Sequence, residues 1–132
     1  MKTSDFQCGE LFSFTAKTAL WDKEITLNIE LDEERDLSET LACFLDVINE
    51  RLLWLQENRG AVLSALCADG VHDRLGVSEK ELSEQFSPDE ATVYCDDGRE
   101  NVWVHIFLNI GSACVEVSLS PDNLCESRGV CG

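Results

Sequence analysis

The sequence predicts an α+β domain in which an antiparallel sheet of about five strands has helices packed on one face. Three observations support this class: strictly alternating apolar residues in the first third, apolar residues at helical spacing in the middle, and a return to alternation in the last third. The expected order is two strands, three helices and three strands. The length of 132 residues suits a single domain over 1–132, with an irregular C-terminal tail at 121–132.

Two strands are expected before the helices. A short, weak strand covers 11–15, and a stronger one covers 25–31. In the stronger strand every second residue, from Ile25 to Leu31, is apolar, which is typical of a half-buried strand. The charged run at 32–36 then predicts a turn.

A long helix should follow this turn. Asp36 opens it with Glu39 three residues later, as in a capping box. Apolar residues between Leu37 and Leu55 recur at helical spacing and form one wide stripe. Asn58-Arg59-Gly60 predicts the break that ends it.

Two shorter helices complete the middle of the chain. One covers 61–68 and stops at Asp69-Gly70. The other begins after Ser78, which caps it together with Glu81, and it ends shortly before Pro88, whose ring cannot continue a helix.

Three strands are expected in the last third, over 91–95, 101–110 and 113–119. Asp96-Asp97-Gly98 is a hairpin turn signal between the first two, and Gly111-Ser112 is a turn between the last two.

The strand at 101–110 places Trp103, His105 and Phe107 on the face away from the helices. A sheet face turned to water should be polar, so two large aromatic residues there indicate a protein-binding patch. The alternative is that the C-terminal tail or the N-terminal strand covers Trp103 and Phe107. Neighbouring strands are expected to add polar residues to the same face, namely Thr26, Asn28, Glu30, Cys114, Glu116 and Ser118.

The charge of the chain points to a basic protein partner. Twenty-six acidic residues against ten basic ones give a formal net charge of −16. Such a polyanion is poorly suited to nucleic acid or to an anionic membrane, but it suits a basic protein, which it attracts over long range. The alternative is a plain solvated surface. The expected electrostatic contacts flank one strand and its hairpin: Asp89, Glu90, Asp96, Asp97 and Glu100.

The cysteines predict no cofactor. There are seven, they are widely spaced and no C-x-x-C pair occurs, so a zinc cage has little support. Reduced thiols in the cytoplasm are expected, although Cys125 and Cys131 could close a loop under oxidation.

No catalytic or metal motif emerges either. His72 and His105 lack metal-ligand spacing, and there is no nucleophile elbow, so no catalytic site is expected. A Cys–His pair that meets only in space stays open. No apolar run approaches the roughly 20 residues of a membrane span, and the first residues lack an apolar signal core, so we expect a cytoplasmic protein.

The chain resembles the small bacterial domains of uncharacterised function that recur among immunity proteins of polymorphic-toxin and contact-dependent growth inhibition systems. The resemblance extends over most of 20–120. It rests on an N-terminal Trp before an alternating strand, a long amphipathic helix followed by further helices, and a closing meander: Trp21, 25–31, 37–86, Tyr94, Asp97-Gly98, His105 and Val115.

This resemblance implies a protein that binds and neutralises one cognate toxin, with a basic nuclease as one possibility, and it transfers no catalytic residues. In this hypothesis Trp103, His105 and Phe107 are anchors, while the carboxylates set association rate and specificity. The alternatives are a self-associating structural or adaptor domain without a toxin partner, and an enzyme that uses Cys and His.

Overall fold

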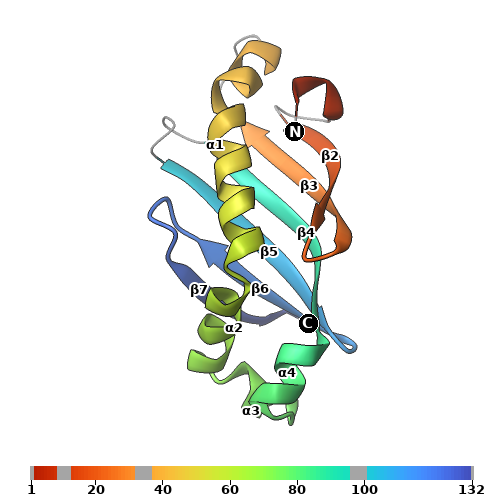
Figure 1. Cartoon of the computed structure of the whole chain (residues 1–132), viewed down its shortest axis with the longest axis vertical. Helices are drawn as coiled ribbons and strands as arrows, with labels where there is room; N and C mark the ends of the chain where they lie inside the picture. Colours follow the sequence, from red (N-terminus) through yellow and green to blue (C-terminus); the bar gives the residue numbers. More distant parts are fainter. Residues whose placement is uncertain (1, 9–12, 32–36, 96–100, 132) are drawn as a thin grey trace.

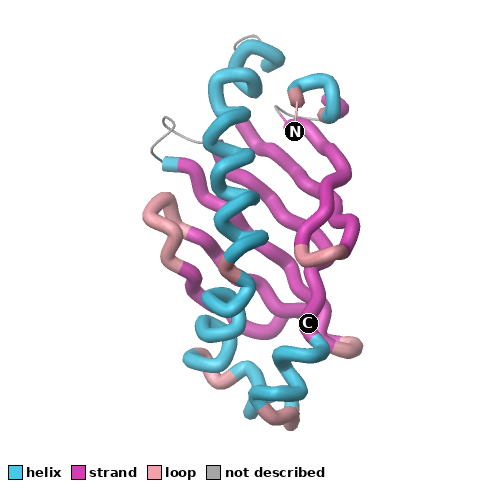
Figure 2. Tube along the Cα trace, in the orientation of Figure 1, coloured by secondary structure: helices cyan, strands magenta, loops and turns pink. Residues whose placement is uncertain are grey.

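A computed structural model of the chain describes residues 2–8, 13–31, 37–95 and 101–131, and it confirms the α+β class. Figure 1 shows one sheet with α1 and α2 crossing the same face of it, while α3 and α4 lie at one end. Figure 2 shows the same separation of helices from strands. The helices are α1 (Leu37–Glu57), α2 (Arg59–Ala68), α3 (Val71–Leu75) and α4 (Glu79–Gln85), and a short 3-10 turn covers Thr3–Asp5.

The sheet has seven strands, which lie side by side in sequence order. They are β1 (Gln7–Cys8), β2 (Ser13–Leu20), β3 (Lys23–Leu31), β4 (Phe86–Cys95), β5 (Val102–Ile110), β6 (Ala113–Leu119) and β7 (Cys125–Cys131).

The expected antiparallel sheet of about five strands is corrected in two respects. The sheet is mixed, because β3 and β4 pair in parallel while the other neighbouring pairs are antiparallel. The helical segment between β3 and β4 returns the chain to the starting end of the sheet, which is what a parallel pair requires. The strand count rises because β1 and β7 extend the two edges, and β7 occupies part of the tail that was expected to be irregular.

The local signals at α4 act as predicted, whereas β4 begins at Phe86, five residues before the predicted strand at 91–95. The Ser78 hydroxyl accepts a hydrogen bond from the Glu81 backbone N–H, and the Glu81 carboxylate accepts one from the Ser78 backbone N–H, which completes the capping box. Pro88 lies inside β4, where the register shifts between Pro88 and Glu90; a proline is tolerated inside a strand at such a bulge. The predicted Asp36 cap and the 96–98 turn lie outside the described residues.

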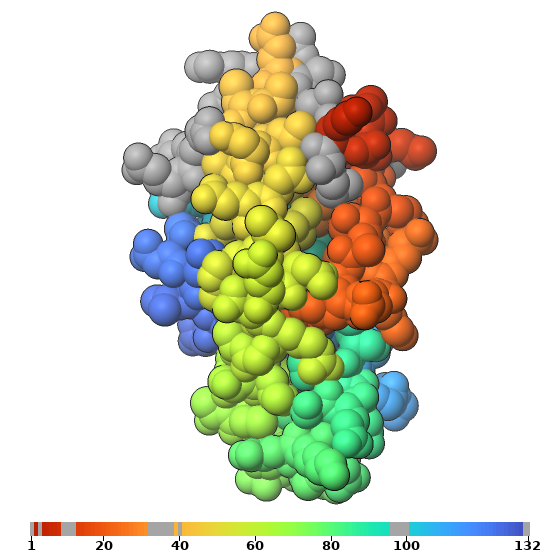
Figure 3. Space-filling model, in the orientation of Figure 1, coloured from red at the N-terminus to blue at the C-terminus, as the bar shows by residue number. Residues whose placement is uncertain are grey.

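The core lies between α1 and the inner face of the sheet. Ile25, Leu27 and Ile29 of β3 are at most 1% exposed, and so are Ile48 and Leu55 of α1. Each such side chain contributes about 1.5–3 kcal/mol by leaving water. Figure 3 shows the helical face, where the side chains of α1 and α2 cover the middle of the sheet.

The position of β7 excludes the loop closure considered for Cys125 and Cys131. These residues begin and end the same strand. Six strand steps separate their Cα atoms by about 20 Å. A disulfide needs Cα atoms within about 7 Å of each other.

Candidate protein-binding surface

The face of β3–β7 turned away from the helices is called the outer face here. Its residues alternate with core residues along each strand; for example, Trp103 lies between Val102 and Val104, which are at most 1% exposed. The strand register brings side chains of the outer face together from five strands. They are Thr26, Asn28, Glu30, Glu90, Thr92, Tyr94, Trp103, His105, Phe107, Cys114, Glu116, Ser118 and Glu126.

Aromatic rings gather on this face. Tyr94 of β4 lies directly opposite Trp103 of β5, and these side chains are 37% and 40% exposed. The His105 ring meets the Tyr94 ring edge to face, with centroids 5.0 Å apart and an interplanar angle of 76°. Phe107, two residues further along β5, is half-buried. The fold therefore leaves large apolar surface in contact with water, where a soluble sheet would place polar groups.

Polar contacts fix the side chains around these rings. Nδ1 of His105 lies 2.7 Å from Oε1 of Glu116 on β6. The Asn28 amide of β3 donates a hydrogen bond to the Glu90 carboxylate of β4. These hydrogen bonds join side chains of neighbouring strands and orient them on the outer face.

Carboxylates border the aromatic residues. Glu30 lies beside Tyr94 in the β3–β4 register, and Glu90 and Glu116 lie on either side of Phe107. Burial raises the pKa of Tyr94, and the charges of Glu30 and Glu116 raise it further, so the phenol stays neutral at physiological pH. The face thus combines an apolar centre with an anionic border, a composition suited to a basic protein.

Comparison with protein-family models, curated proteins and solved structures finds no significant match to this chain.

The residues predicted as anchors share the outer face: Trp103, His105 and Phe107 all lie on β5 and point away from the helices. Of the predicted electrostatic contacts, Glu90 lies on this face opposite Phe107. Asp89 is exposed at the β4 bulge and has no partner in the register. The other three, Asp96, Asp97 and Glu100, lie outside the described residues.

Neither chain end covers the aromatic residues in the described part of the chain. The C-terminal segment pairs with the edge of β6 as β7, and the N-terminal strand pairs with β2 at the opposite edge. Both segments add strands at the edges of the sheet, so neither crosses the outer face. Trp103 consequently stays 40% exposed.

Sequence reasoning missed Tyr94 as part of this surface. The signal was present: Tyr94 occupies the same face as Thr92, and the hairpin turn that follows predicts pairing with the start of the next strand. Its pairing with Trp103 follows from those two facts.

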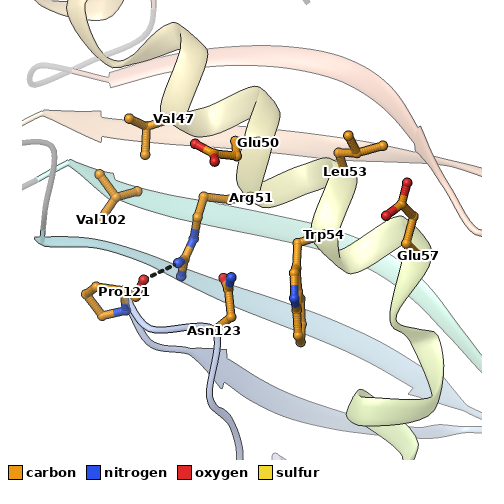
Figure 4. Close-up of a pocket in the computed structure, with 9 residues that line it drawn as sticks. All are labelled: Val47, Glu50, Arg51, Leu53, Trp54, Glu57, Val102, Pro121 and Asn123. Carbon is orange, nitrogen blue, oxygen red and sulfur yellow. Dashed lines mark hydrogen bonds between the residues drawn. The ribbon is translucent and has the colours of Figure 1, made fainter.

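A pocket lies on the helical side of the molecule, where Arg51 extends from α1 toward the loop that precedes β7 (Figure 4). Its guanidinium donates to the carbonyl oxygens of Pro121 at 2.6 Å and Leu119 at 3.3 Å, and also to Ser120. Arg51 is 6% exposed, and burial lowers its pKa, while the charges of Glu50 and Asp122 oppose that shift. The neighbouring pocket measures about 410 Å³. Nη1 and Nη2 of Arg51 donate to these carbonyls and hold the loop between β6 and β7, while Nε is buried without a hydrogen-bond partner among the described residues.

Three thiols have raised pKa values. Burial raises the pKa of Cys95 to about 12, and burial is also the main cause for Cys67 and Cys125. A nucleophilic cysteine needs a lowered pKa, so these three are poor nucleophiles.

Proposed function

We propose that this protein binds a basic protein partner through the outer face, and that the partner is a cognate toxin domain which it neutralises in the cytoplasm. The observation that supports the proposal is the exposed pair Tyr94–Trp103 on a face bordered by carboxylates. The fold gains nothing from exposing these rings, whereas a partner could bury both.

The aromatic residues would supply most of the affinity. Tyrosine and tryptophan are enriched among the few interface residues whose truncation costs about 2 kcal/mol or more. Trp103 and Tyr94 form the exposed aromatic pair near one end of the outer face, and the His105 ring packs against that of Tyr94. Truncation of Trp103 should therefore weaken binding by about 30-fold or more.

The carboxylates would act mainly on the rate of encounter. A molecule of net charge −16 attracts a basic partner over long range, and salt screens that attraction. Self-association through the same face is disfavoured, because two copies would bring Glu30, Glu90 and Glu116 of one toward those of the other.

The identity of the partner as a toxin rests on the resemblance to immunity-associated domains. A toxin that acts on nucleic acid presents a cationic surface, because phosphate binding depends on Lys and Arg. An anionic inhibitor that covers this surface would block substrate access. Such an inhibitor needs no catalytic residue of its own.

The test is a binding titration against the C-terminal domain encoded by the gene directly upstream, at low and high salt. We expect tight binding whose association rate falls as salt rises. Trp103→Ala should weaken binding about 30-fold. Leu53→Ala is the matched control, because Leu53 is 57% exposed but lies on α1, on the opposite side of the sheet.

Two results would count against the proposal. Absence of binding at both salt concentrations would reject the toxin partner. Equal loss of affinity in the Trp103 and Leu53 variants would reject the outer face as the contact surface. Light scattering of the protein alone supplies a further check, since a dimer abolished by Trp103→Ala would favour the self-associating adaptor.

A further inference from the structure

Three potential metal ligands meet where the short helices turn. Cys67 lies near the end of α2, His72 lies on α3, and Glu79 is the first residue of α4. The Cys67 sulfur, one His72 ring nitrogen and a Glu79 carboxylate oxygen all lie within 4.8 Å of one another. We propose that these residues form a divalent transition-metal site, selective for Zn²⁺, that is separate from the outer face and independent of the proposed toxin binding.

The turn between α2 and α3 brings the first two ligands together. Gly70 has φ of 73°, a left-handed conformation that L side chains rarely adopt. It reverses the chain within the five residues that separate Cys67 from His72. Gly76, with φ of 70°, then ends α3 and directs the chain toward Glu79.

The His72 ring nitrogens make no hydrogen bond among the described residues, so they are available to a metal ion. Its side chain is 16% exposed, and its Nδ1 is buried with no hydrogen-bond partner among the described residues. Its Nε2 lies 3.8 Å from Oε1 of Glu79 and 3.7 Å from Oδ1 of Asp73, both beyond hydrogen-bonding distance. The buried Nδ1 without a hydrogen-bond partner requires an explanation, and coordination of an ion is one.

The spacing suits a small tetrahedral ion. With metal–ligand bonds of about 2.0–2.3 Å, neighbouring ligand atoms of a tetrahedral zinc centre lie about 3.3–3.8 Å apart. Nε2 of His72 and Oε1 of Glu79 are 3.8 Å apart, a few tenths of an ångström wider than the about 3.3–3.5 Å expected for nitrogen and oxygen ligands of one zinc ion. Glu79 is exposed, so rotation of its side chain can bring its oxygen to the ion at little cost.

The ligand types select the metal. A thiolate and an imidazole favour Zn²⁺ or Co²⁺ over Mg²⁺ and Ca²⁺, which take oxygen ligands. One thiolate and one carboxylate neutralise the two charges of the ion, and the Cys67 proton leaves to solvent on binding. Three protein ligands leave the fourth position for water. The net charge of −16 further raises the local concentration of divalent cations.

The experiment is a titration of the reduced full-length protein with Co²⁺ and Zn²⁺ in excess Mg²⁺, which occupies sites made only of carboxylates. We expect one equivalent of Co²⁺ to give the thiolate-to-cobalt charge-transfer absorption, and one equivalent of Zn²⁺ to abolish it. Outer-shell partners of bound metals are worth about 10–100-fold in affinity, so loss of a direct ligand should cost at least about tenfold. Cys67→Ser, His72→Ala and Glu79→Gln should each show that loss.

Matched controls separate this site from the other thiols and acids. Cys43→Ser removes an exposed thiol on α1, and Glu84→Gln removes an exposed carboxylate on α4; both should bind as the unaltered protein does. The proposal is overturned if the protein gives no charge-transfer band, or if Cys43→Ser abolishes the band while Cys67→Ser keeps it. Unchanged affinity in Glu79→Gln, an exposed position that does not endanger folding, would remove Glu79 from the site.

Discussion

His105 lies between two partners on the outer face, with the Tyr94 ring on one side and the Glu116 carboxylate at 2.7 Å on the other. The His105 and Glu116 side chains are 19% and 27% exposed, so water screens their contact only in part. The contact orients the imidazole and thereby supports the ring of Tyr94. A single residue of β6 thus helps to set the shape of an aromatic patch on β4 and β5.

Loss of that carboxylate should therefore have a measurable cost. Glu116→Ala removes one partly buried hydrogen bond, and we expect the free energy of unfolding to fall by about 0.5–1.5 kcal/mol. Urea denaturation measures the change. Glu84→Ala, at an exposed position on α4, is the control and should change stability by less than about 0.5 kcal/mol. Equal effects of both substitutions would show that the His105 contact contributes nothing.

The thiols should differ sharply in reactivity. Cys95 is 2% exposed with a pKa of about 12, whereas Cys43 is exposed on α1. Because thiolate is the reacting species, a thiol-specific reagent at neutral pH should label Cys43 rapidly and Cys95 only after unfolding. Mass spectrometry of the labelled peptides gives the order. Fast labelling of Cys95 in the native protein would contradict its burial.

At the scale of elements, β7 depends on α1 through Arg51. The guanidinium reaches three consecutive carbonyl oxygens, those of residues 119–121, in the loop that leads into β7. The Ser120 carbonyl also accepts a hydrogen bond from the Asn123 backbone N–H at 2.9 Å, so Arg51 adds to the hydrogen bonding within this loop. An edge strand of the sheet is thus fixed by a side chain from a helix about 70 residues earlier.

Replacement of Arg51 should loosen this edge. Arg51→Ala removes charge-assisted hydrogen bonds from the carbonyls of residues 119–121, and we expect a loss of about 1–3 kcal/mol in the free energy of unfolding. Arg51→Lys should recover only part of it, because one ammonium cannot reproduce the planar fork. The control is Lys80→Ala, at an exposed position on α4, which should change the free energy of unfolding by less than about 0.5 kcal/mol. Faster amide hydrogen exchange in 125–131 for Arg51→Ala alone would locate the effect.

Some helices and strands can be located from local sequence patterns alone, and others cannot. Strict alternation located β3 and β5, and the Ser78–Glu81 signal located the start of α4, because these patterns are local. At five residues, α3 is too short for helical periodicity to register. The parallel β3–β4 pair depends on contacts between distant segments, whereas β7 escaped prediction because Cys125–Cys131 shows no strict apolar alternation.

The residues of the candidate sites likewise divide into those that a local pattern predicts and those that only the three-dimensional fold brings together. The outer-face residues of β5 were predictable because strand parity fixes which side chains share a face. The cluster of Cys67, His72 and Glu79 was not, because its ligand spacing matches no linear motif and depends on how α2, α3 and α4 turn. The carbonyl contacts of Arg51 likewise required the loop after β6 to be placed.

At the scale of the whole molecule, charge opposes compactness. Sixteen net negative charges repel one another in the folded state, and this repulsion lowers stability at low ionic strength. Among the described residues no helix is both long and apolar enough to cross a bilayer.

Added salt should therefore stabilise the fold. We expect the free energy of unfolding to rise between low salt and about 0.5 M NaCl, as the screening length shortens well below 10 Å. Thermal or urea denaturation across a salt series measures it. KCl at equal ionic strength should act alike, and a flat or falling response would show that the charges are already balanced locally.

The parallel pairing of β3 with β4 also governs the order in which the protein can assemble. Thr26 pairs with Glu90 and Leu31 with Cys95, so this one ladder joins positions 64 residues apart, whereas the neighbouring ladders join segments close in sequence. Closing so long a loop is entropically slow, and contacts of this range reduce folding rates. The β2–β3 hairpin and the β4–β7 meander are each able to form early. Their junction then sets the folding speed, and the outer face, which spans it from Asn28 to Glu126, is complete only when that last step is done.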